Sequence, residues 1–157
     1  MAKANVRLDY SELQKLKEQI EQMSDQSHMD QFMESCAKEL AARLLAKVIK
    51  RTPTGRYKKG SGKVGGTLKR GWTGGNNGNG AAYAQSLKVE KVGNDYVIEI
   101  INPVEYASYV EFGHRTRDHA GWVEGRFMLT VSEREIQASA PNILEKKLTK
   151  YLKECFK

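Results

Sequence analysis

The sequence has few residues that could cross-link the chain or anchor it. Only two of its 157 residues are cysteines, Cys36 and Cys155, and they lie far apart without a CxxC pair. This usage favours a reducing compartment over a disulfide framework. The N-terminus has no apolar core for a signal peptide, and no run approaches the roughly 20 apolar residues of a membrane span. We therefore expect a soluble protein made in a cytoplasm, with no membrane partner.

Groups for catalysis are also scarce. There are three histidines, and neither cysteine has a histidine near it in sequence, so a nucleophile activated by a base is not indicated. The stretch GSGKVGGT is not a phosphate loop, because Tyr57 and Val64 occupy positions where the motif requires Gly and Ser or Thr. We expect no enzyme and no cofactor.

Acidic residues are missing from one long interval. All 19 acidic residues lie outside the interval between Glu39 and Glu90 or at its two ends. By contrast, 11 of the 26 basic residues lie inside it. The net charge of +7 is therefore concentrated in one part of the chain. Such asymmetry indicates a surface that meets an anionic partner, either phosphate or an acidic protein face.

The N-terminal residues predict a helical arm. Apolar residues recur at three- and four-residue steps over residues 10–23, with Asp9 or Ser11 as a possible cap, which indicates an amphipathic helix. The polar stretch SDQSHMD interrupts the pattern. We expect residues 1–27 to form this arm and residues 28–157 to form a single domain.

A longer helix is predicted over residues 30–51, where the helical period resumes and continues until just before Pro53. Residues 52–80 then contain ten glycines and no sustained apolar period, which predicts a long flexible loop with a short strand near residues 67–72. The basic residues of this loop are Arg56, Lys58, Lys59, Lys63, Lys69 and Arg70.

Two β-rich runs follow, residues 84–92 and 95–102. The Gly-Asn dipeptide between them predicts a tight turn and an antiparallel hairpin. Further helices are predicted over residues 127–136 and 139–156. The order of helices, a small antiparallel sheet and helices indicates an α+β fold.

The stretch VEYASYVEFGHRTR, residues 104–117, concentrates three aromatic residues, two carboxylates, a histidine and two arginines around one glycine. Its first part predicts a short helical turn, and Gly113 is expected to end that turn with a bend that a Cβ would resist. We expect Glu111 to form an ion pair with Arg115 or Arg117.

The order of several motifs carries a resemblance. RTPTGRY after a helix, then GGTLKRGW, a hairpin, YASYVEFGHRTR, and GRFML before a long helix resemble the bacteriophage HK97 gp10-like family of tail-associated proteins, over roughly residues 30–156. This chain departs from the family pattern in its Gly-rich insertion, which separates Thr54 and Gly55 from Leu68 and Trp72.

The resemblance implies a non-enzymatic virion protein, a tail-completion or head-to-tail connector subunit that forms a ring, expected to be a hexamer, at the neck end of a phage tail or tail-like particle. It implies assembly in the bacterial host cytoplasm, with the tail tube, terminator or connector proteins as partners and with non-specific contact to DNA. The implied corner residues are Tyr106, Tyr109, Phe112 and Gly113. The implied assembly contacts are Arg56, Lys58, Lys59, Lys63, Lys69, Arg70, Trp72, Glu111, Arg115 and Arg117.

Two alternatives stay open. In a nucleic-acid-binding module, residues 56–70 would track phosphates while Tyr57 and Trp72 stack on bases. In a small metal-dependent hydrolase, His114 and His119 would share a zinc ion with a nearby carboxylate, although structural zinc ligands usually have tighter spacing. Steep salt dependence of DNA affinity would favour the former, and stoichiometric metal the latter.

Overall fold

The computed structural model describes residues 11–75 and 79–156. The described helices are α1 (Ser11–Ser24), α2 (Gln26–Arg51), α3 (Thr67–Gly71), α4 (Gly80–Ser86), α5 (Ala107–Phe112) and α6 (Met128–Cys155). The described strands are β1 (Val89–Val92), β2 (Asp95–Ile98), β3 (Gly113–Arg115) and β4 (Trp122–Glu124), in two antiparallel pairs. Helices flank small antiparallel sheets, which confirms the α+β class.

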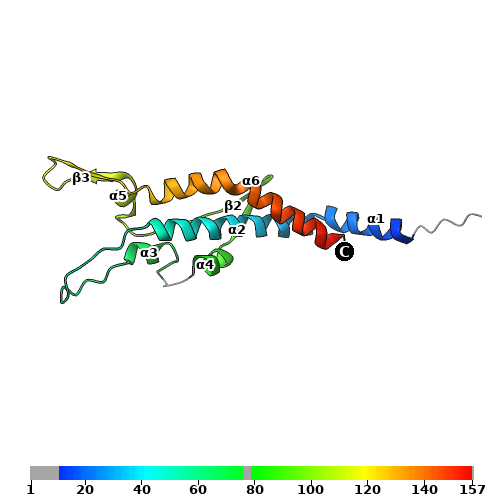
Figure 1. Ribbon diagram of the computed structural model, residues 1–157, viewed down its shortest axis with the longest axis horizontal. Helices are drawn as coiled ribbons and strands as arrows, with labels where there is room; N and C mark the ends of the chain where they lie inside the picture. Colours follow the sequence, from blue (N-terminus) through cyan, green and yellow to red (C-terminus); the bar gives the residue numbers. More distant parts are fainter. Residues whose placement is uncertain (1–10, 76–78, 157) are drawn as a thin grey trace, which may run out of the picture.

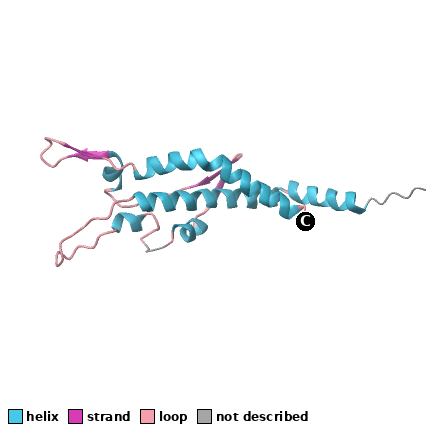
Figure 2. Ribbon diagram, viewed as in Figure 1, coloured by secondary structure: helices cyan, strands magenta, loops and turns pink. Residues whose placement is uncertain are grey.

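The molecule is elongated. Helices α2 and α6 run side by side along its long axis, and α1 extends beyond α2 at one end (Figure 1). At the opposite end, the loop between α2 and α3 and the β3–β4 hairpin both project outward (Figures 1 and 2). The two ends of the molecule therefore present different chain segments.

Helix α1 confirms the amphipathic helix predicted near the N-terminus, although its possible cap Asp9 lies outside the described residues. The interruption after it is shorter than predicted: Asp25 alone separates the helices, and its carboxylate accepts a hydrogen bond from the Ser27 N–H. Because Asp25 caps α2, this helix begins at Gln26 rather than near residue 30. The boundary between an arm and a domain at residue 27 stays a prediction.

The core lies between α2, α3, α4 and the start of α6. Its buried apolar side chains are Ala41, Leu45, Val48, Leu68, Trp72, Ala84 and Met128. The strand predicted near residues 67–72 is wrong, because these residues form α3. Leu68 and Trp72 are four positions apart, so both side chains lie on the same face of the helix, where they are buried in the core.

Residues 52–80 do not form one continuous loop. Residues 52–66 lack regular structure before α3 begins, and Thr52, Trp72 and Thr73 are buried. The Asn79 side chain accepts from the Ala81 N–H and so caps α4. Residues 76–78 of the predicted loop lie outside the described residues.

The β1–β2 hairpin is confirmed, with Val92 paired to Asp95 across the Gly-Asn turn. Residues 84–86 belong to α4 instead of the first strand. One face of the hairpin is tied to α2 through Asp30, whose carboxylate accepts from the Tyr96 hydroxyl and from the Lys91 ammonium at 2.9 Å. These contacts lower the pKa of Asp30 to about 2.

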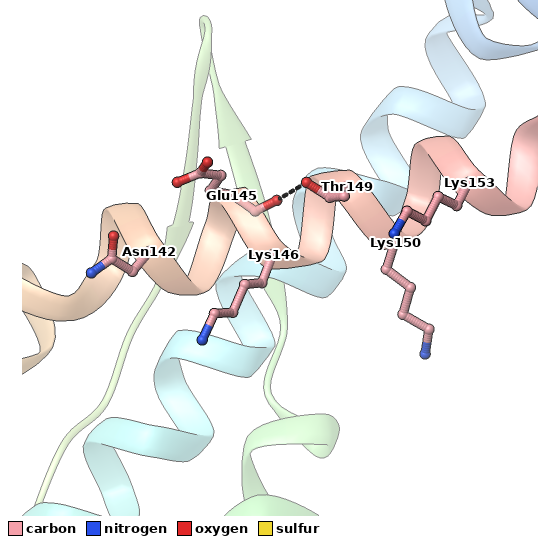
Figure 3. A pocket seen from close by; sticks show the side chains of 6 residues that line it. All are labelled: Asn142, Glu145, Lys146, Thr149, Lys150 and Lys153. Atoms are coloured by element: carbon pink, nitrogen blue, oxygen red, sulfur yellow. Dashed lines mark hydrogen bonds between the residues drawn. The ribbon is translucent and has the colours of Figure 1, made fainter.

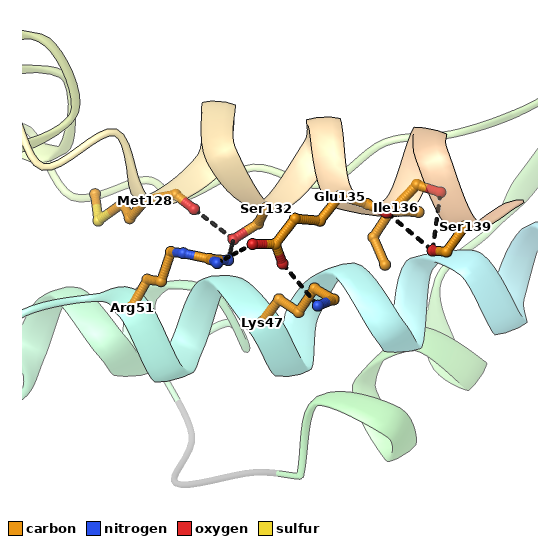
Figure 4. Close-up of polar contacts among 7 residues, drawn as sticks. All are labelled: Lys47, Arg51, Met128, Ser132, Glu135, Ile136 and Ser139. Carbon is orange, nitrogen blue, oxygen red and sulfur yellow. Dashed lines mark hydrogen bonds and ion pairs between the residues drawn. The ribbon is translucent and has the colours of Figure 1, made fainter.

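The two predicted C-terminal helices are one 28-residue helix, α6, with Pro141 inside it. Proline removes one backbone donor and bends a helix without having to end it, and Figure 1 shows α6 bent along its length. Contacts to α2 hold both sides of the bend: Lys47 and Arg51 bind Glu135 before Pro141 (Figure 4), and Lys147 binds Glu39 at 2.9 Å after it. Lys47, and then Arg51, lower the pKa of the Glu135 carboxyl.

Candidate assembly surfaces

Glu111 connects α5 to the N-terminus of α6. Its side chain is only 5% exposed, and its carboxylate accepts three hydrogen bonds, from the Leu129 N–H at 2.9 Å and from the N–H and hydroxyl of Thr130 at 2.9 and 2.7 Å. The residue that precedes α6, Phe127, has a left-handed backbone and forms no side-chain cap. Glu111 therefore supplies the missing cap from another helix, and its negative charge is favourable at a helix N-terminus.

This role corrects the expectation that Glu111 pairs with Arg115 or Arg117. Among the ion pairs of the described residues, none includes Glu111. The carboxylate accepts three hydrogen bonds inside the protein. Glu111 is a positioning residue for the corner where α5, β3–β4 and α6 meet.

The glycines at this corner allow backbone to touch backbone. Gly113 has φ 86°, as predicted, and a Cβ there would lie 2.5 Å from the Val123 carbonyl oxygen. A Cβ on Gly125 would lie 2.4 Å from the Glu111 carbonyl oxygen. The Arg126 N–H donates to the Val110 carbonyl at 2.7 Å. The corner is therefore closed by main-chain contacts.

The three aromatic residues predicted to anchor this corner do not do so. Tyr106, Tyr109 and Phe112 are all exposed, Phe112 by 62%. Ala107 and Val110 pack against the core instead. The aromatic side chains are therefore available on the described surface, where they can contact a partner.

The β3–β4 hairpin is an element that the sequence did not predict. Gly113 pairs with Glu124 and Arg115 with Trp122, so Arg115 and the exposed Trp122 lie opposite each other. Arg117 is exposed in the connecting turn. Short strands without alternating hydrophobicity give little local signal, and apart from Gly113 the residues of both strands are exposed.

His114 and His119 do not form a metal-binding cluster with other described side chains. The His114 ring lies 5.7 Å from the Tyr109 ring between centroids. Asp118 accepts from the Thr116 hydroxyl and the Ala120 N–H, and the Thr116 hydrogen bond is the main cause of its lowered pKa. Within residues 11–75 and 79–156, no three His, Cys, Asp or Glu side chains gather closely enough to hold a metal ion.

Residues 53–66, here called the basic arm, project from the same end as this hairpin (Figure 1). Both ends of the arm are anchored. The Trp72 indole N–H donates to the Thr52 hydroxyl at 2.8 Å, and Thr52 donates to the Val48 carbonyl. Trp72 is 3% exposed, so it anchors the arm and is not the surface contact that the sequence predicted.

The arm is also pinched just above its base. A Cβ on Gly65 would lie 2.2 Å from the Gly55 carbonyl oxygen, so the two limbs touch there through their backbones. Arg70 lies on α3 and donates to the Gly65 carbonyl and the Thr67 hydroxyl, and it is partly buried with Lys69. These two predicted contact residues therefore sit at the base of the arm.

The remaining four charges, Arg56, Lys58, Lys59 and Lys63, are exposed along the arm beyond the pinch. None forms an ion pair with a described carboxylate. Apolar surface accompanies them, because Val64 is 76% exposed and Tyr57 is half exposed. Tyr57, Val64 and Tyr106 line a groove of about 280 Å³ between the arm and α5.

A second basic surface follows the C-terminal half of α6. Lys146, Lys150 and Lys153 are exposed beside Asn142 and Thr149, and Figure 3 shows Lys146 and Lys150 extended from one side of the helix. The sequence predicted a helix over residues 139–156 but did not indicate this basic surface.

An apolar groove of about 250 Å³ is a further surface that sequence analysis missed. Ile101, Ala107, Phe112 and Leu129 line it, between the segment after β2, α5 and the start of α6. Ile101 and Phe112 are exposed.

No helix of the described ranges is both long and apolar enough to cross a membrane.

Comparison with known proteins identifies the family of this chain. No curated protein and no solved structure matches the chain significantly. Residues 14–113 match the HK97-gp10-like family model, which describes the bacteriophage HK97-gp10 tail component. The match begins before the region in which the sequence motifs resemble this family, and it ends at Gly113, so β4 and α6 lie outside it. It covers more than half of the chain, including the basic arm, the β1–β2 hairpin and α5 with Glu111, and the protein therefore belongs to the HK97-gp10-like family of bacteriophage tail components.

Proposed function

We propose that the protein is a structural, non-enzymatic subunit that assembles as a ring at the neck end of a phage tail or tail-like particle, as a tail-completion or head-to-tail connector protein. One observation carries this proposal. The elongated protomer bears different unpartnered segments at its two ends, the basic arm and β3–β4 hairpin at one and α1 at the other.

A protomer of this kind is suited to contacts between unlike surfaces. Like surfaces meet in closed dimers, whereas unlike surfaces link subunits head to tail into rings or filaments. A tail component is associated with the virion and contacts other tail proteins, so its projecting segments have partners within one particle. In the proposed ring, a hexamer is the expected size.

Helix α1 is the proposed second assembly segment. Its apolar residues Leu16 and Ile20 are exposed, and the helix extends beyond the layer formed by α2 and α6. Removal of residues 1–24 keeps the Asp25 cap of α2. The truncated protein should remain folded, with a thermal midpoint near that of the full chain, but it should assemble less readily. Outright unfolding would assign α1 to the core.

The direct test of the proposed function is imaging and mass measurement of the purified protein, alone and with tail tubes from the same particle. Concentration-dependent rings, or rings seated on tube ends, are the expected result. A protein that stays monomeric at high concentration and does not bind tubes would contradict it. Mass photometry of the same samples gives the subunit number.

The exposed charges of the basic arm favour one alternative function, a nucleic-acid-binding module. Arg56, Lys58, Lys59 and Lys63 could neutralise phosphates, and Tyr57 could stack on a base. In the proposed ring such contact with DNA is weak and non-specific. Tight binding to one DNA sequence at physiological salt, lost when these four residues become Gln, would replace the ring proposal by this alternative.

A further inference from the structure

We propose that the acidic partner of the basic arm is the outward face of the β1–β2 hairpin on a second copy of this chain. The inference rests on the proposed ring and names the pair of surfaces that would join neighbouring subunits. It goes beyond the family assignment, because it specifies which residues of one molecule meet which residues of the next.

The two faces of this hairpin differ sharply. Residues paired across antiparallel strands point to the same side, so Lys91 and Tyr96 both face Asp30 of α2. The pairs Glu90 with Val97 and Val92 with Asp95 alternate with them and therefore point outward. This outward face is not covered by any described element, and Val92 is 61% exposed on it.

The outward face is acidic and borders a groove of about 500 Å³. Of the residues that line this groove, Glu90 and Val97 lie on the outward face, Ile98 belongs to the inner face, and Leu87, Lys88 and Glu99 flank the strands. Glu90 binds Lys88 at 3.0 Å, an exposed pair that contributes little. Asp95 and Glu99 form no ion pair with a described cation.

The basic arm complements this face in both of its properties. It carries four exposed cations and no carboxylate, whereas the groove presents carboxylates beside partly exposed aliphatic side chains. Val64 and Tyr57 give the arm apolar surface that could fill the groove between Val97 and Leu87. Complementary charge would fix the orientation of the contact, and buried apolar area would stabilise it.

The contact must be between two molecules. Figure 1 shows the arm projecting at one end, whereas the β1–β2 hairpin lies alongside α2 and its turn points toward the α1 end. Arm and hairpin are also different surfaces, so each molecule would donate one arm and receive another. Repetition of such a contact generates a ring when the rotation closes.

The test uses two charge-reversal variants of the full chain, Lys58→Glu with Lys59→Glu in the arm, and Glu90→Lys with Glu99→Lys in the hairpin. All four side chains are exposed, so both variants should keep the wild-type thermal midpoint. Each variant alone should lose self-association by on the order of 100-fold, because like charges then meet at the reversed positions.

An equimolar mixture of the two variants should restore assembly, because every arm then meets a hairpin of opposite charge. Sedimentation velocity and negative-stain imaging give the readout. A matched control variant, Lys146→Glu with Lys150→Glu, reverses two exposed lysines on α6. It should assemble normally if the arm binds the β1–β2 hairpin.

Several results would overturn the pairing. These are wild-type assembly by either reversal variant, failure of the mixture to recover, and equal loss in the α6 control. In those cases wild-type rings still support the proposed function, and the arm has another acidic partner. Absence of wild-type rings, both alone and with tail tubes, would instead contradict the proposed function itself.

Discussion

The basic arm and the β3–β4 hairpin leave the same end of the molecule but are attached to it by different chemistry. The arm is held by side chains in the core, chiefly Trp72 and its hydrogen bond to Thr52. The hairpin is held by close backbone contacts at Gly113 and Gly125. A side chain in the core can be replaced by a smaller one of similar shape. At a glycine whose backbone touches another backbone, no side chain fits.

The largest effect should come from Gly113→Val. Its φ of 86° is unfavourable for a β-branched residue, and the new Cβ would meet the Val123 carbonyl oxygen and the Gly125 nitrogen. The free energy of unfolding should fall by on the order of 3 kcal/mol. Chemical denaturation measures this, with Gly121→Val in the same hairpin as the control, because a Cβ there meets only Thr116 at 3.4 Å. Equal midpoints for the two variants would show that the corner is not closed by its backbone.

Glu111→Ala should have the second largest effect. It leaves two N–H groups at the start of α6 without their acceptor, at a cost of about 2 kcal/mol. Glu105→Ala changes an exposed carboxylate nearby and should leave the thermal midpoint unchanged. If both variants melt together, Glu111 does not act as the cap of α6.

Trp72→Phe should destabilise the protein by about 1.5 kcal/mol, through lost volume and a lost hydrogen bond. Combined with Thr52→Val, its effect should be smaller than the sum of the two single changes, because the Trp72 indole and the Thr52 hydroxyl bind each other. Denaturation of all four proteins in this cycle measures the coupling. Strict additivity would mean that this hydrogen bond does not stabilise the base of the arm.

The smallest effect on stability should come from changing the four exposed basic residues of the arm to Gln, because Arg70, which donates to the Gly65 carbonyl, is then left in place. The exposed charges Arg56, Lys58, Lys59 and Lys63 have no described carboxylate partner. The free energy of unfolding should therefore change by no more than about 0.5 kcal/mol. Incorporation into particles should nevertheless be abolished. Infectious or bactericidal particles containing the variant would show that these charges are not needed for assembly.

Local signals predicted the elements whose causes are local. The helical period gave α1 and most of α2, and the Gly-Asn turn gave the β1–β2 hairpin. The same approach placed a break near Pro141, because a proline rule takes no account of the contacts that hold α6 to α2 on both sides. Helix α3 is too short for its period to be visible in the sequence.

The roles of single residues were harder to predict. Trp72 and Glu111 were expected at the surface and are buried anchors, whereas Tyr106, Tyr109 and Phe112 were expected to be anchors and are exposed. Their residue types permit either role. The outcome depends on non-local contacts, such as those of Glu111 with Leu129 and Thr130, which no pattern within residues 104–117 reveals.

The pinch between Gly55 and Gly65 has an entropic consequence for assembly. Fixing the backbone of one residue costs about 1 to 2 kcal/mol at 25 °C. Because the limbs of the arm already touch at these glycines, only the residues between them would lose conformational freedom when the arm binds a neighbour. A bulkier residue at Gly65 would separate the limbs and lengthen the segment that must be ordered. In the proposed ring, these two glycines would therefore strengthen binding between subunits without touching the neighbouring molecule.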